Sequence, residues 1–172
     1  GPRPLGPQAA RLAKIVVLDA GETFQPFQSN LPVLLVTEDN PGLIQMYRIL
    51  LGNFEGFEVV IVTNLTQARQ VVRTTPKEKL FVVSDNDFPT GGETIHTTYA
   101  GQTFVKELRE KGIYVMVSSG VLKAKIFPPG GDVQPDGFFQ KPEGFRNLIS
   151  SIIQRAEAIR SQLAKNKLIA EG

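Results

Sequence analysis

The chain has 172 residues, 41% of them hydrophobic, and its 19 Lys and Arg against 17 Asp and Glu leave a formal net charge of only +2. This predicts one globular domain with tails, and the lack of a Lys/Arg block argues against nucleic-acid binding by this segment. With no cysteine, no apolar run near the roughly 20 residues of a membrane span and no signal-peptide layout, we expect a soluble, cytoplasmic protein without disulfides and without a membrane partner.

The first 30 residues predict an N-terminal extension. Residues 1–11 are rich in Pro and Gly, which is typical of a flexible lead. A short β-like run at 15–18 follows, and the sequence leaves open whether it adds an edge strand or is disordered. We place the main domain at 31–165 and a C-terminal tail at 166–172.

From residue 31 onward, short Val/Ile/Leu/Phe runs alternate with segments of helical period. That alternation predicts a parallel sheet covered by helices on both faces. The predicted strands are 33–36, 59–62, 80–83, 114–117 and 137–139.

Local signals mark where the helices begin and end. Asn40 and Pro41 provide an N-cap and a first-turn proline, and the apolar positions of the helix that follows are Leu43, Ile44, Tyr47, Leu50 and Leu51. Asn64 starts the next helix. A long polar stretch, 90–100, precedes the third helix. A short helix at 121–126 is broken by the Pro/Gly run at 128–131, and an amphipathic helix closes the domain.

Polar residues stand at the ends of four predicted strands: Glu38 and Asp39, Asp85, Ser118, and Lys141. The carboxyl ends of parallel strands share one edge, so we expect these side chains to converge there. Two charges 4 Å apart repel by about 4 kcal/mol at an effective dielectric near 20, so three clustered carboxylates need a cation or shared protons. Mg²⁺ prefers such oxygen ligands, and one carboxylate could attack a phosphoryl group that the hydroxyl and the amine stabilise.

These motifs together resemble those of the receiver domains of two-component response regulators, over Leu31 to about Arg155. The matching segments are Val36-Thr37-Glu38-Asp39-Asn40-Pro41, Val83-Ser84-Asp85-Asn86-Asp87-Phe88-Pro89, Val117-Ser118-Ser119 and Phe139-Gln140-Lys141-Pro142. The resemblance implies a flavodoxin-like (CheY-like), doubly wound five-stranded parallel sheet in the order 2-1-3-4-5, here with an irregular fourth helix.

The resemblance also implies roles for these residues. Asp85 would accept a phosphoryl group from a phosphohistidine of a sensor histidine kinase or a histidine phosphotransfer protein. Mg²⁺ would be bound by Glu38 or its water, Asp39, Asp85 and the backbone carbonyl of Asp87. Ser118 would move toward the phosphoryl group, although Ser119 is an alternative, and Lys141 would offset its charge.

Phe138, three residues before Lys141, would be the switch aromatic that alters a face read by a downstream partner or an output domain. Such a protein phosphorylates and dephosphorylates itself but is not a turnover enzyme.

Two other functions stay open. The insertion at 90–100, which contains His96, and the break at 128–131 depart from the family pattern, and the break favours a pseudo-receiver that binds partners without phosphorylation. Asp85-Asn86-Asp87 also resembles the Asp-x-Asp of haloacid-dehalogenase-type phosphatases. Those enzymes carry a further acidic pair after the Lys, whereas here the pair lies upstream. The order of the motifs therefore favours the receiver.

Overall fold

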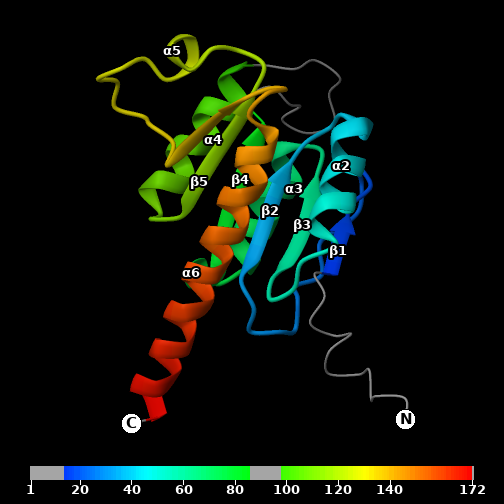
Figure 1. Ribbon diagram of the computed structural model, residues 1–172, viewed down its shortest axis with the longest axis vertical. Helices are drawn as coiled ribbons and strands as arrows, with labels where there is room; N and C mark the ends of the chain where they lie inside the picture. The colour runs from blue at the N-terminus through cyan, green and yellow to red at the C-terminus, as the bar shows by residue number, and fades with distance from the viewer. Residues whose placement is uncertain (1–13, 86–97, 172) are drawn as a thin grey trace.

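The part of the chain that the structure describes folds around one parallel sheet of six strands (Figure 1). The structure is a computed structural model that describes residues 14–85 and 98–171. The strands lie in the order β1-β3-β2-β4-β5-β6. Their bounds are β1 Lys14–Val17, β2 Val33–Thr37, β3 Glu58–Val62, β4 Leu80–Asp85, β5 Tyr114–Ser119 and β6 Gly137–Gln140.

The five strands predicted for the main domain are present, and they lie in the predicted order. The question left open for the N-terminal extension is also answered, because β1 adds a sixth strand at the edge of the sheet. It pairs in parallel with β3, from Lys14 opposite Glu58 to Val17 opposite Ile61. Val16 is half-buried and packs against the core, so β1 also contributes apolar surface.

Helices cover both faces of the sheet, as predicted (Figure 1). Helices α2 and α6 pack on one face, and α3 and α4 pack on the other, so that the sheet separates two apolar clusters. The helical elements are α2 Pro41–Leu51, α3 Leu65–Thr74, the 3-10 turn η1 Lys77–Lys79, α4 Thr98–Glu110, α5 Lys123–Ile126 and α6 Phe145–Glu171.

The predicted caps explain where α2 and α3 begin. Asn40 precedes α2 in extended conformation and its side chain accepts a hydrogen bond from the Leu43 amide at 3.1 Å. Asn64 does the same for α3, accepting from the Gln67 amide at 2.9 Å. One expectation for α2 is wrong: Leu50 does not join the buried face, since it is 36% exposed.

The segment between β1 and β2 is bound across α3 as a strap, which we define as residues 18–30. Gln67 donates to the carbonyls of Asp19 at 2.6 Å and of Glu22 at 3.0 Å. The Gln70 side chain accepts a hydrogen bond from the Phe24 amide at 3.0 Å and donates one to the Phe24 carbonyl at 3.2 Å. Phe24 itself is buried in the cluster on the α3 side. The polar connector predicted here is thus part of the folded body.

The last two helices of the chain differ in regularity. Helix α5 has only four residues, so the predicted irregularity of the fourth helix is confirmed. Helix α6 has 27 residues and runs past the sheet (Figure 1). It includes 166–171, the segment predicted as a tail, where Leu168 and Ile169 are 69% and 77% exposed. None of the helices in 14–85 or 98–171 combines the length and apolar character that crossing a bilayer requires.

Candidate phosphorylation site

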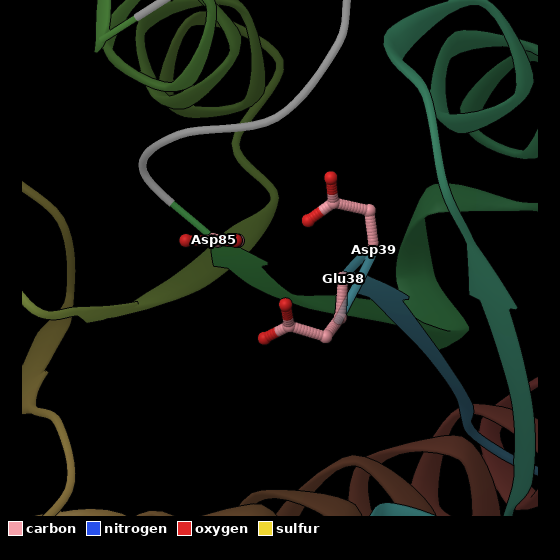
Figure 2. A group of neighbouring side chains, drawn as sticks. All are labelled: Glu38, Asp39 and Asp85. Atoms are coloured by element: carbon pink, nitrogen blue, oxygen red, sulfur yellow. The ribbon is translucent and has the colours of Figure 1, made fainter. Parts of the chain in front are cut away.

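Three carboxylates gather at the carboxyl ends of β2 and β4 (Figure 2). One oxygen of each of Glu38, Asp39 and Asp85 lies within 4.8 Å of the others. Glu38 and Asp85 are buried, and Asp39 is half-buried. The strands β2 and β4 are direct neighbours in the sheet, with Thr37 opposite Ser84, and this pairing brings the acidic pair beside Asp85.

Lys141 reaches the same carboxylates from the end of β6. Its Nζ lies 3.1 Å from Glu38 Oε1 and 3.4 Å from Asp85 Oδ1. Burial by itself would lower the pKa of Lys141, but the charges of Asp85 and Glu38 outweigh burial and raise the pKa. The amine is therefore held as a cation between two carboxylates. The Lys141–Pro142 peptide bond is cis.

Two hydroxyls beneath the site fix the backbone of Asp85, and the sequence analysis missed both. Thr37 Oγ1 accepts a hydrogen bond from the Asp85 amide at 3.0 Å. Ser84 Oγ lies 3.4 Å from Thr37 Oγ1 and donates to the Asp85 carbonyl at 3.1 Å. Both are fully buried in otherwise apolar strands. In the sequence, each of them stands between the last apolar residue of its strand and a carboxylate of the site.

The register of β4 and β5 places Ser118, rather than Ser119, on the Asp85 side of the sheet. Ser118 is directly opposite Asp85. Side chains alternate between the two faces along a strand. Ser119 lies two residues after Val117 and therefore shares its face, and the Val117 side chain lies in the α3–α4 cluster. Ser119 Oγ instead accepts from the Val121 amide at 2.9 Å. Ser118 is thus the hydroxyl placed to reach a group on Asp85.

Tyr47 of α2 is a further polar group at the site, although the sequence pattern indicated only a position on the apolar face of its helix. The pKa of Tyr47 is raised well above its usual value, mainly because the side chain is buried, and the charges of Glu38 and Asp85 raise it further. A hydrogen bond with the Ser118 side chain acts in the opposite direction. The phenol is therefore neutral and stands next to both carboxylates and to Ser118.

Phe138 points to the opposite face of the sheet from the carboxylates. Its side chain is half-buried against the α3–α4 cluster, and its ring lies edge-on to Phe127, with centroids 6.5 Å apart. Phe127 directly follows the short helix α5. The predicted switch aromatic thus contacts the irregular segment that replaces a full fourth helix.

Some predicted features lie outside the described residues. They include Asp87, whose carbonyl was predicted as a metal ligand, His96, and residues 90–97 of the insertion. The last three insertion residues, 98–100, form the first turn of α4.

The sequence matches no protein-family model and no curated protein, but the fold matches solved structures of receiver domains. A CheY-like response regulator receiver domain protein from Methanospirillum hungatei JF-1 has a TM-score of 0.59 at 16% identity, over 77% of this chain and 99% of that one. The signal receiver domain of an HD domain-containing protein from Pseudomonas fluorescens Pf-5 has a TM-score of 0.60 at 15% identity, over 77% and 99%.

A DNA-binding response regulator of the LuxR family from Staphylococcus aureus has a TM-score of 0.56 at 20% identity, over 73% of this chain and 99% of that one. Similarity at these identities is similarity of fold. The chain has the CheY-like fold of response regulator receiver domains, with one added edge strand, and its acidic cluster and lysine lie at the carboxyl edge of that sheet.

Proposed function

We propose that this chain is a phosphoacceptor receiver domain of a two-component system or phosphorelay, with Asp85 as the acceptor. One observation carries the proposal: the Asp85 carboxylate lies beside two further carboxylates, and the amine of Lys141 lies 3.4 Å from it. A nucleophilic oxygen, a site for a divalent cation and a fixed positive charge are the three components that phosphoryl transfer requires.

In the proposed transfer, Asp85 is the nucleophile. A carboxylate oxygen forms a bond to phosphorus while the bond between phosphorus and the imidazole nitrogen of a phosphohistidine breaks, and the nitrogen keeps the electron pair. The product is an acyl phosphate. Lys141 is placed to offset the charge on the phosphoryl oxygens, and its contact with Asp85 keeps it there before transfer.

The donor set suits Mg²⁺, because the clustered ligands are all carboxylate oxygens. Asp39 and Asp85 would hold the ion, with Glu38 either as a direct ligand or through a water and with the Asp87 carbonyl as a further ligand. When bound, Mg²⁺ neutralises charge on the transferring phosphoryl group. The chain's own residues supply the nucleophile, the positioning of that nucleophile and the lysine.

Partners follow from the same proposal. The phosphoryl donor would be a sensor histidine kinase or a histidine phosphotransfer protein. Phosphorylation adds about −1.5 to −2 charges at Asp85, and Ser118 and Phe138 would carry the response to a face that a downstream partner or an output domain reads. The protein would be phosphorylated once per molecule and would not act as a turnover enzyme.

Mass spectrometry after treatment with acetyl phosphate and Mg²⁺ tests the proposal. The wild-type chain should gain one phosphoryl group, and Asp85→Asn should gain none. Asp132→Asn is the matched control, because Asp132 is exposed and lies outside the acidic cluster. A mass gain that survives Asp85→Asn would contradict the assignment, as would continued turnover of p-nitrophenyl phosphate by the wild type.

A second candidate function is a pseudo-receiver, and the shape of the signalling side favours it. Helix α5 has four residues, and 127–136 contain no helix or strand. A face this irregular could bind a partner without phosphorylation. Beryllofluoride with Mg²⁺ separates the two functions: amide shifts at Asp85 and Ser118 support the receiver, and a folded protein without such shifts supports the pseudo-receiver.

A further inference from the structure

A cavity of about 400 Å³ lies between α6 and the turn that joins α2 to β3. The apolar side chains of Phe54, Ile153 and Ala156 line it, and Phe54 is 39% exposed. Arg160 lines it as well, and its guanidinium occupies the space that a side chain at Gly56 would take. The cavity is therefore an apolar depression with a fixed wall beside the middle of α6.

The last part of α6 exposes almost all of its side chains. We define residues 160–171 as the overhang. Every side chain in it is exposed except that of Leu163, which is half-buried, and Leu168 is 69% exposed. The overhang runs past the sheet (Figure 1). A helix of about 12 residues is only marginally stable in water by itself, so packing against a partner would stabilise the overhang.

The cavity and the overhang share one face of α6. Side chains that follow one another at steps of three or four residues form a stripe along a helix. Such a stripe runs here from the cavity to the overhang through Ile153, Glu157, Arg160, Ala164 and Leu168. Leu168 follows Ala156 by 12 residues, which is about 18 Å along the helix axis. Filling the cavity with Leu168 therefore takes a second molecule.

The charges on this stripe favour a second α6 that runs antiparallel to the first. Glu157 lines the cavity, whereas Lys167 lies in the overhang. Placing Glu157 opposite Lys167 of a second copy also puts Leu168 of that copy opposite Ala156. Two-fold symmetry repeats both pairs. The Lys167 side chain is 71% exposed, with its amine 4.0 Å from Glu171 of the same helix, so it is accessible to a second molecule.

We propose that α6 forms a two-fold homodimer in which the overhang of each copy lies antiparallel along α6 of the other and Leu168 enters the cavity. The apolar surfaces of Leu168 and Phe54 then leave water, which supplies most of the affinity. An exposed ion pair contributes little affinity, so Glu157 and Lys167 mainly set the orientation of the two helices. This inference does not depend on the proposed function, because the acidic cluster takes no part in it.

Sedimentation velocity at about 200 µM, a concentration that populates a weak dimer, tests the role of Leu168. The wild type should sediment as a dimer and Leu168→Asp as a monomer. Ile169→Asp is the matched control, because Ile169 is 77% exposed but lies about 100° further around the helix. This variant should remain a dimer. Both substitutions are at exposed positions, and circular dichroism verifies that both variants fold.

Charge reversal tests the pairing of Glu157 with Lys167. Glu157→Lys and Lys167→Glu should each weaken dimerisation about tenfold, because each places like charges opposite each other twice. The double variant restores opposite charges and should return to within about threefold of the wild-type dissociation constant. A double variant as weak as the two single variants would overturn the proposed alignment.

Disulfide trapping tests the orientation, and the chain has no cysteine of its own to interfere. A mixture of Glu157→Cys and Lys167→Cys should form linked pairs on oxidation. Neither variant should do so alone, since equal positions in the antiparallel dimer are about 15 Å apart along the axis. Linked pairs from either variant alone would overturn the antiparallel arrangement.

The remaining outcomes bear on the dimer itself. A wild type that is monomeric at this concentration overturns the proposal. A dimer that persists in Leu168→Asp, or that is lost equally in Ile169→Asp, also overturns it, because the contact would then not lie on the proposed face. Asp85→Asn should dimerise like the wild type, so a failure of phosphorylation and a failure of dimerisation are distinguished.

Discussion

Glu38 connects three parts of the candidate site through one buried carboxylate. Its Oε1 accepts from Lys141 Nζ at 3.1 Å, and its Oε2 accepts from the Asn40 amide at 3.2 Å. Asn40 is in turn the N-cap of α2, the helix that carries Tyr47. A single side chain thus ties the end of β6 to the start of α2, which explains how a carboxylate with 1% exposure is tolerated.

Glu58, the first residue of β3, is a second buried carboxylate, far less well compensated by positive charge than Glu38. Burial raises its pKa above 4.5, and the charges of Lys14 and Lys79 offset only part of this effect. Folding therefore favours the protonated form. The stabilising contribution is fully present below about pH 4.5 and is lost as the pH rises through the folded-state pKa.

We therefore expect Glu58→Gln to raise the free energy of unfolding at neutral pH and to lose this advantage in acid. Denaturant unfolding at a series of pH values measures the difference. Glu78→Gln, at an exposed position on η1, is the control and should show no such dependence. A destabilised Glu58→Gln at neutral pH would show instead that the lysines outweigh the cost of burial.

At the scale of elements, the added strand and the strap complete the edge of the sheet. The strand β1 covers the outer side of β3, and an uncovered edge strand would be open to pairing with another chain. The strap then crosses α3, where Phe24 is 2% exposed and lies edge-on to Phe27, with ring centroids 5.5 Å apart. These segments belong to the same folded unit as the strands that carry the site.

Phe24→Ala should consequently destabilise the whole protein by about 3 kcal/mol, the lower end of the range for a buried phenylalanine. The measurement is equilibrium unfolding in denaturant. Phe54→Ala, at a side chain that is 39% exposed, should cost much less and serves as the comparison. Similar losses from both variants would mean that the strap is only loosely attached.

At the scale of the whole molecule, ion pairs at the site connect the ends of three strands, β2, β4 and β6. Lys141 from β6 contacts the carboxylates after β2 and β4, and these strands are separated from β6 by β5. Without a cation the carboxylates would repel one another. Lys141 and a bound divalent ion therefore both stabilise the same carboxyl edge of the sheet.

Lys141→Met should lower the free energy of unfolding by about 2 kcal/mol without Mg²⁺, because it leaves buried carboxylates without their nearest cation. Added Mg²⁺ should then raise the melting temperature of this variant more than that of the wild type. Lys111→Met, at an exposed lysine directly after the end of α4 and outside the acidic cluster, should match the wild type in both respects. An equal response of Lys141→Met and the wild type to Mg²⁺ would argue that the ion does not bind beside Lys141.

Much of the architecture could be read from local pattern. Five apolar runs, two asparagine caps and the Pro/Gly break at 128–131 correspond to elements or irregularities of the fold. The edge strand could not be settled, since a four-residue run has no periodicity of its own and becomes a strand only by pairing with β3. Leu50 was misplaced because one apolar residue in a helix does not reveal where the buried face ends.

Local patterns were enough to identify the polar residues at the strand ends, because strand period and helix caps are local properties. The position of Tyr47 near those residues depends instead on how α2 packs on the sheet. An inward-facing tyrosine on a helix looks like any other core residue until the helix is packed across a particular pair of strands. Packing α2 against the ends of β4 and β5 turns that apolar-looking position into a hydroxyl beside Ser118.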